Sequence, residues 1–133
     1  MNNKLLHCDL TDKIIGTFYD VYNALGFGFL EKVYENSLVV ALTRQGLTVA
    51  QQDPISVYYD GAHVGTYFAD IIVNQLVIIE VKVSESLHTT HEAQLLNYLK
   101  ATQIEVGLLL NFGEKPDFRR KAFSNERKRH VKH

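Results

Sequence analysis

An acidic and a basic side chain lie two residues apart in the middle of an apolar segment of the sequence. Glu80 and Lys82 interrupt the otherwise apolar residues 76–83. In a β-strand, side chains at positions i and i+2 project from the same face, so both charges would emerge together from a segment suited to burial. A buried charge needs an opposite charge or a metal ion, and an isolated ion pair adds little stability because desolvation offsets the attraction. The pair therefore favours a functional site.

A second acid supports this interpretation against a simpler one. Glu and Lys also alternate on sheets with one solvated face, but the aliphatic residues 76–79 argue against a wet face. Asp70 interrupts the preceding apolar run, residues 67–73. Two neighbouring strands thus each carry one internal acid, and we expect both carboxylates to share one metal ion.

Length and composition predict one globular domain. The chain has 133 residues, of which 46% are hydrophobic, enough for a substantial core. The single cysteine, Cys8, excludes an intrachain disulfide, and no apolar run approaches the roughly 20 residues that span a bilayer. The first ten residues lack the profile of a signal peptide. We therefore expect a cytoplasmic protein without a membrane partner.

The net charge of −1 hides an uneven distribution. Residues 114–133 contain eight Lys or Arg and three Asp or Glu, whereas residues 1–113 contain six and twelve. A basic C-terminal segment that includes Arg119, Arg120 and Lys121 can neutralise phosphates. Charge runs at a terminus are also often only solvated, so composition alone leaves both interpretations open.

Hydrophobic periodicity predicts two helices followed by three strands. The first helix has an apolar stripe from Ile14 to Leu25 after the possible caps Asp9 and Thr11, and the second covers about residues 30–45. Glu31 lies in the first turn of the second helix, where the helix dipole favours a carboxylate. The strands cover residues 55–60, 63–73 and 76–83. A two-residue turn at Asn74 and Gln75 would make the last two strands antiparallel and bring Asp70 and Glu80 to comparable heights.

A third helix and a fourth strand complete the expected order. Thr89 and Glu92 have the spacing of a capping box and predict a helix over residues 90–102. Gln94 and Tyr98, four residues apart, would form a stripe that can face the carboxylates. The apolar residues 104–112 predict a strand parallel to the Glu80 strand. The expected fold is α/β, in the order αα-βββ-α-β, with a mixed central sheet flanked by helices.

These residues together resemble the PD-(D/E)XK nuclease superfamily. Asp70 is followed after ten residues by Glu80-Val81-Lys82, and residues 94–98 resemble the Q-x-x-x-Y element of its RecB-like exonucleases. Residues 28–34, Gly-Phe-Leu-Glu-Lys-Val-Tyr, match the motif that names the GxxExxY family, a branch of that superfamily. The resemblance runs from about residue 14 to residue 121. Ala69 stands where the superfamily often has proline.

The resemblance implies a restriction-endonuclease-like core in a single domain over residues 1–133, with a basic C-terminal segment at residues 114–133. It implies a metal-dependent nuclease that hydrolyses phosphodiester bonds, with DNA as the expected substrate and Mg²⁺ or Mn²⁺ as cofactor. The implied ligands are oxygen donors, from Asp70, Glu80, the Val81 carbonyl and Glu31. The implied catalytic residues are Asp70, Glu80, Lys82, Gln94, Tyr98 and Glu31.

Contacts to nucleic acid are expected from His91 and from the basic residues Arg119, Arg120 and Lys121. A zinc site at His88 and His91 is disfavoured, because no cysteine partner lies nearby and oxygen ligands suit magnesium or manganese better. The alternative function is a catalytically silent module that binds nucleic acid or protein on the same fold. Whether the chain forms a homodimer or has a protein partner is left open.

Overall fold

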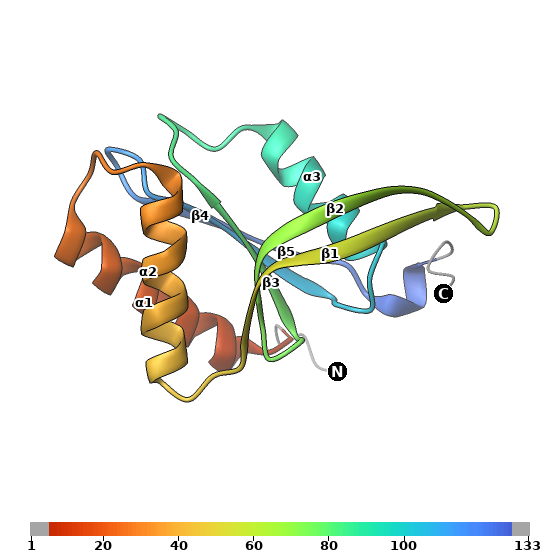
Figure 1. The fold of residues 1–133 in the computed structure, drawn as a ribbon, viewed down its shortest axis with the longest axis horizontal. Helices are drawn as coiled ribbons and strands as arrows, with labels where there is room; N and C mark the ends of the chain where they lie inside the picture. The colour runs from red at the N-terminus through yellow and green to blue at the C-terminus, as the bar shows by residue number, and fades with distance from the viewer. Residues whose placement is uncertain (1–5, 129–133) are drawn as a thin grey trace.

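The computed structural model describes residues 6–128, in which a five-stranded sheet carries helices on both faces (Figure 1). The elements, in chain order, are α1 (Cys8–Leu25), α2 (Glu31–Arg44), β1 (Val49–Tyr59), β2 (Ala62–Val73), β3 (Val77–Lys82), α3 (Thr89–Lys100), β4 (Val106–Asn111), β5 (Asp117–Ala122) and the 3₁₀ helix η1 (Asn125–Arg127). The expected α/β class with a mixed, helix-flanked sheet is confirmed.

The strands lie side by side in the order in which they occur in the chain. β3 and β4 run parallel, and the pairs β1–β2, β2–β3 and β4–β5 are antiparallel. α3 forms the crossover between β3 and β4, as expected for two parallel neighbours. Over residues 6–128, none of the helices has both the length and the apolar character needed to cross a membrane.

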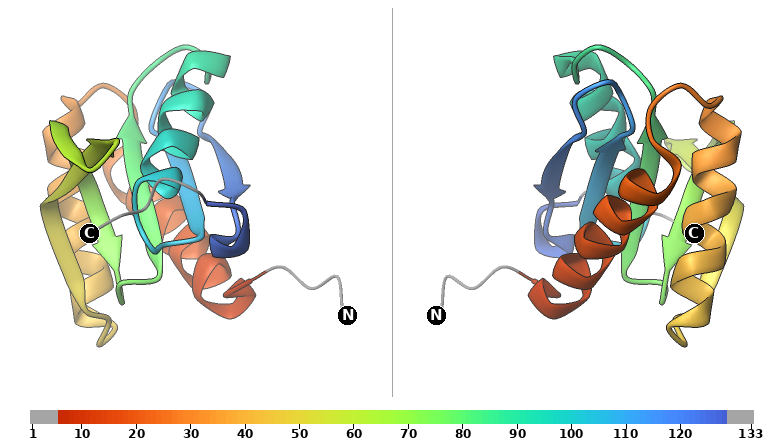
Figure 2. Two further views of the ribbon diagram at one scale, coloured as in Figure 1. Left: turned by 90° about the vertical axis from the view of Figure 1, so that its right-hand side faces the viewer. Right: turned by 90° about the vertical axis from the view of Figure 1, so that its left-hand side faces the viewer.

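Two apolar cores cover the two faces of the sheet. Ile79 and Val81 of β3 pack in the core that also holds residues of α1 and α2, whereas Ile78 packs with Leu95 and Leu99 of α3. Figure 2 shows the helices on opposite sides of the sheet. Because side chains alternate along a strand, Glu80 and Lys82 lie on the α3 face with Ile78.

The turn between β2 and β3 is one residue longer than expected. Val73 pairs with Val77, so residues 74–76 form the loop, and Asn74 and Gln75 adopt positive φ angles of 52° and 55°. Continuing this register places Asp70 directly opposite Glu80. The expected two-residue turn would have shifted the register by one residue, which moves every side chain to the other face.

The basic segment contains a strand that the sequence analysis missed. Residues 117–122 form β5, which pairs along its whole length with β4, so the element order is αα-βββ-α-ββ. The expected element order ended with the strand over residues 104–112 and did not include this fifth strand. Residues 129–133 of that segment lie outside the described residues.

The start of α3 also differs from expectation. The helix begins at Thr89 after the N-cap His88, and the His88 backbone N–H donates to Nδ1 of His91 at 3.2 Å. His91 thus takes the position that the expected capping box gave to Glu92. Glu92 is instead free to bind the basic side chains of β5.

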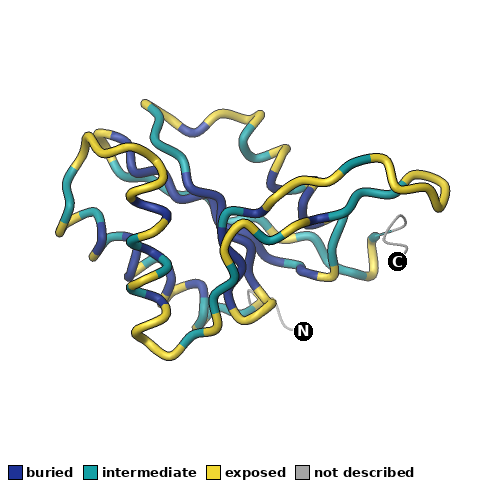
Figure 3. Tube along the Cα trace, viewed as in Figure 1, coloured by how far each residue is buried: buried dark blue, intermediate teal, exposed yellow. Residues whose placement is uncertain are grey.

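The β1–β2 hairpin extends well beyond the rest of the sheet (Figure 1). β1 begins at Val49, six residues before the expected start, and contains Pro54, which an edge strand tolerates because its N–H side can face away from the ladder. The outer part of the hairpin is largely exposed (Figure 3). Its inner part pairs with β3, through residues 71–73 of β2.

Replacing Gly113 by alanine should destabilise the fold by about 1–3 kcal/mol, the usual penalty for overpacking. An added Cβ would lie 2.1 Å from the Ser84 carbonyl oxygen, and the Asn111 side chain holds both backbone polar groups of Ser84 at 2.9 Å. Urea denaturation measures the loss. Gly65→Ala is the control, because its Cβ meets nothing within 4 Å. Equal denaturation midpoints would contradict the prediction.

Candidate active site

Asp70 and Glu80 are joined by two hydrogen bonds that run between side chain and backbone. The Asp70 N–H donates to Oε2 of Glu80 at 3.0 Å, and the Val81 N–H donates to Oδ2 of Asp70 at 2.8 Å. These bonds follow directly after the regular pairs formed by residues 71–73 and 77–79. The two carboxylates therefore replace backbone carbonyls as acceptors and are held beside each other.

Burial and mutual repulsion make both acids hard to ionise. Glu80 is only 4% exposed, and desolvation, followed by the charge of Asp70, raises its pKa to about 8. Desolvation also raises the pKa of Asp70, although the hydrogen bond from Val81 opposes this effect. Without a bound cation, the site thus favours the protonated form of Glu80.

Glu31 lies close enough to join this charge cluster. It begins α2, and burial, followed by the charge of Asp70, raises its pKa, while Lys82 lowers it. Within residues 6–128, however, no group of three or more His, Cys, Asp or Glu side chains is arranged to hold one metal ion. The preformed part of the candidate metal site is therefore the pair Asp70 and Glu80.

The donor chemistry of this pair fits a hard divalent cation. Both groups offer carboxylate oxygens, the ligands that Mg²⁺ and Mn²⁺ prefer. A cation beside them would also offset the repulsion that raises their pKa values.

A fourth carboxylate, Glu35, was missed by the sequence analysis. It is 2% exposed and accepts hydrogen bonds from Nε2 of Gln51 at 2.8 Å and from Nε2 of Gln52 at 2.9 Å. Lys32 forms an ion pair with it at 3.2 Å. Its position four residues after Glu31 places both acids on one side of α2, and this spacing was the available signal.

Gln52 connects Glu35 to the acid pair. Its Nε2 also lies 3.3 Å from Oδ1 of Asp70, and its backbone has a positive φ of 53°. The register of β1 and β2 places Gln52 opposite Asp70. A left-handed backbone at a glutamine has no signature in the sequence, so this residue could not have been found there.

The other expected catalytic residues lie around the pair on the α3 face. Nε2 of Gln94 donates to the Tyr98 hydroxyl oxygen at 3.1 Å. Desolvation, followed by the charges of Glu80 and Asp70, raises the pKa of Tyr98 to about 12. Desolvation, followed by the charge of Lys82, lowers the pKa of His91. Through these couplings, α3 brings Tyr98 near the acids and His91 near the lysine.

The expected phosphate-binding residues lie on β5, separated from the acids by β4. Arg119 and Lys121 both form ion pairs with Glu92 of α3, and Arg119 also pairs with Asp117 at 2.8 Å. Arg120 points to the opposite face, where its guanidinium donates to the Leu6 carbonyl. These residues are thus not brought into the acid cluster.

Comparison with known proteins adds a family and a fold. A family model described as the PD-(D/E)XK nuclease superfamily matches residues 8–121. The crystal structure of SSO0001 is similar to this chain with a TM-score of 0.52 and 17% sequence identity, and the match covers 87% of this chain and 59% of that one. At this identity the likeness concerns the fold alone. None of the curated proteins compared with the chain matches it.

Without metal, the stability of the fold should fall as the pH rises from about 4.5 to about 8. The folded-state pKa of Glu80 is raised to about 8, so folding favours its protonated form, and that contribution is lost as the pH passes through the folded pKa. Glu80→Gln should remove this part of the slope and exceed the wild type in stability at pH 9 by at least about 1 kcal/mol, since one pKa unit is worth about 1.4 kcal/mol. Urea denaturation in EDTA at several pH values measures both. A variant with an unchanged slope would contradict the assignment.

Proposed function

Because the chain belongs to the PD-(D/E)XK nuclease superfamily, we propose that it is a metal-dependent nuclease that hydrolyses phosphodiester bonds of nucleic acid, with DNA as its substrate. One observation carries the proposal. Asp70 and Glu80 hydrogen-bond across two strands, have raised pKa values, and share their surroundings with Lys82. An ion pair that served only to stabilise the fold would need one acid for Lys82, whereas this site has two.

The cofactor that suits this site is Mg²⁺ or Mn²⁺. Its ligands in the proposal are Asp70, Glu80, the Val81 carbonyl and Glu31. A divalent ion of this kind supplies Lewis acidity and lowers the pKa of bound water. Glu35 and Gln52 support the site, because the side-chain amide of Gln52 donates hydrogen bonds to both Glu35 and Asp70.

The remaining side chains act on the phosphate and the water. Lys82 supplies a positive charge beside the acids and is suited to orient the attacking water or to stabilise charge on the phosphate. Gln94 holds the Tyr98 hydroxyl by a hydrogen bond, and the pair can position water or a phosphate oxygen. His91, near Lys82 at the start of α3, is placed to contact the substrate.

Membership of the GxxExxY branch is supported by what its motif does locally. The buried Tyr34 hydroxyl donates to the Gly26 carbonyl and accepts from the Phe29 N–H at 3.2 Å. Gly28 has a φ of 121°, which favours glycine. The glycine and the tyrosine thus fix the loop that delivers Glu31 at the start of α2.

A silent binding module is the second candidate. The observation in its favour is that three metal-binding side chains are not gathered at one point within residues 6–128. The two candidates differ in turnover and in metal binding. One pair of variants separates them.

Lys82→Ala should abolish cleavage while metal binding survives, and Asp70→Ala should lose both, because only the second removes a ligand. Cleavage is measured on single- and double-stranded DNA and RNA, linear and circular, with Mg²⁺, Mn²⁺ or EDTA. Metal binding is measured by thermal unfolding, since a ligand at 100 times its Kd stabilises the fold by about 2.7 kcal/mol. A wild-type protein that neither cleaves nor gains stability from metal supports the silent module. Full activity in Lys82→Ala would contradict the role of the lysine.

We also propose that Arg119 and Lys121 contact phosphates when Glu92 releases them. Glu92→Gln should then strengthen nucleic-acid binding and steepen its salt dependence, whereas Arg119→Ala with Lys121→Ala should flatten it. Each lost phosphate contact reduces the slope of log affinity against log salt by about 0.9 for duplex DNA and about 0.7 for single strands. Arg120→Ala is the control, because its guanidinium lies on the other face. Equal slopes for all four proteins would mean that the β5 cations serve only the fold.

A further inference from the structure

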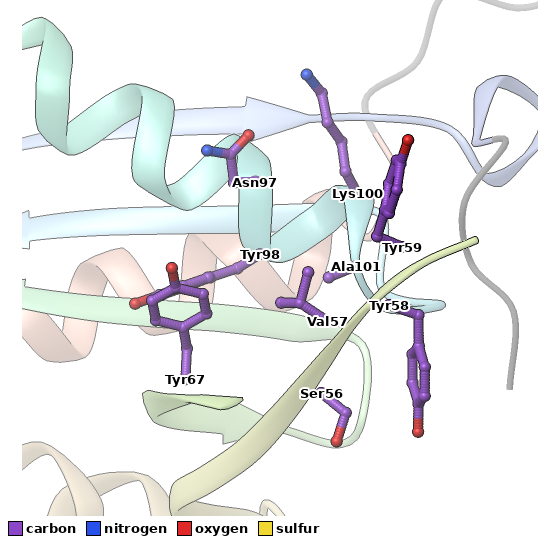
Figure 4. Close-up of a pocket in the computed structure, with 9 residues that line it drawn as sticks. All are labelled: Ser56, Val57, Tyr58, Tyr59, Tyr67, Asn97, Tyr98, Lys100 and Ala101. Atoms are coloured by element: carbon purple, nitrogen blue, oxygen red, sulfur yellow. The ribbon is translucent and has the colours of Figure 1, made fainter. Parts of the chain in front are cut away.

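An aromatic cleft lies between the β1–β2 hairpin and the C-terminal half of α3. Its volume is about 360 Å³. Figure 4 shows Tyr67 and Tyr98 together at one end, Tyr59 beside Lys100 at the other, and Val57 between them. Four tyrosines therefore line the cleft, together with the amine of Lys100 and the apolar side chains of Val57 and Ala101.

The cleft is continuous with the candidate active site. Tyr67 and Tyr98 have ring centroids 5.7 Å apart, and both also line a groove of about 440 Å³ that reaches His91 and Gln94. Tyr98 is the link, because its hydroxyl accepts from Gln94 and lies within the electrostatic reach of Glu80 and Asp70. A ligand that fills the cleft and the groove would therefore lie against Gln94 and Tyr98, two of the expected catalytic residues.

Core packing does not explain the exposed tyrosine side chains of the hairpin. Tyr59 is 73% exposed and Tyr67 is 51% exposed, and neither belongs to the two apolar cores. Exposed tyrosine rings can instead stack on nucleobases in single-stranded nucleic acid, because every base has a π face. A duplex keeps those faces covered by neighbouring bases. Lys100, whose amine lies 5.5 Å from the centroid of the Phe123 ring, stands at the rim, where a phosphate would lie.

We propose that this cleft binds unpaired nucleotides of the substrate by base stacking on Tyr67 and Tyr59, with the buried Tyr98 packed against Tyr67 and Lys100 near the backbone. The occupant is single-stranded nucleic acid, either a free strand or an unpaired end of a duplex. The inference rests on the proposed nuclease function and names its substrate class. Binding there delivers the adjoining phosphodiester to Asp70 and Glu80.

The test measures binding of the full chain to fluorescent oligonucleotides in EDTA, which separates binding from cleavage. Tyr67→Leu should bind a single strand between about fivefold and about 150-fold more weakly than the wild type, the range expected for loss of one stacked base. Its binding to a blunt duplex should not change. Phe68→Leu is the matched control, since Phe68 is 54% exposed and is the next residue along β2, on the other face of the strand. Tyr59→Leu provides a second, independent variant.

Three results would overturn the inference. The first is equal single-strand affinity for wild type, Tyr67→Leu and Tyr59→Leu. The second is equal loss of affinity in Phe68→Leu and Tyr67→Leu. The third is a change in molecular mass by light scattering in Tyr67→Leu, because a second copy of the chain would then cover the cleft.

A parallel cleavage assay with Mn²⁺ keeps this inference distinct from the proposed function. Wild type should cleave single strands or unpaired ends faster than blunt duplex, and Tyr67→Leu should lose that preference. Cleavage without any preference would refute the cleft proposal and leave the nuclease intact. Tyr67-dependent binding without cleavage of any substrate would refute the nuclease and leave the cleft as a binding site.

Discussion

The two hydrogen bonds between Asp70, Glu80 and Val81 are the constraint around which the sheet is arranged. Each backbone N–H in a buried strand needs an acceptor, and here two of them use carboxylates of the opposite strand. The acids are therefore held by the same bonds that hold β2 to β3, and neither can turn away from its neighbour. Like charges so placed oppose ionisation, which stores unfavourable free energy at the site.

The side chains around Asp70 and Glu80 include further acids and too few lysines to neutralise them. Glu31 and Glu35, both on α2, add two more acids near Asp70 and Glu80. The nearby cations are Lys32 and Lys82. Glu35 is buried and holds Gln52, which in turn reaches Asp70. Because four acids lie near only two lysines, a cation bound at Asp70 and Glu80 would favour their ionised forms and would also attract a phosphate. Substrate binding and cation binding would thus be coupled by simple electrostatics.

The sequence predicted those parts of the fold and site that depend on local periodicity. The alternation around Glu80 placed Glu80 and Lys82 on one face, and the four-residue spacing predicted that Gln94 and Tyr98 meet. The parts that depend on tertiary partners were not predicted. The local sequence of β5 shows only a run of charged residues, because its pairing with β4 and with Glu92 depends on distant parts of the chain. Gln52 likewise has a left-handed backbone conformation, and its role appears only in the hydrogen bond to Asp70 on the neighbouring strand.

Three kinds of surface lie around α3: the acid pair, the basic side chains of β5 and the aromatic cleft. The sheet register puts Glu80 beside Leu109 and Leu109 beside Arg119, so the acid and the arginine lie on one rung, about 10 Å apart at two strand spacings. The aromatic cleft lies on the other side of the acids, over β1 and β2. Because α3 covers the sheet between these regions, a polymer that touched both would have to pass the helix start. Glu92 lies there and pairs with both Arg119 and Lys121, so its ion pairs would determine whether the basic strand is available to the same substrate.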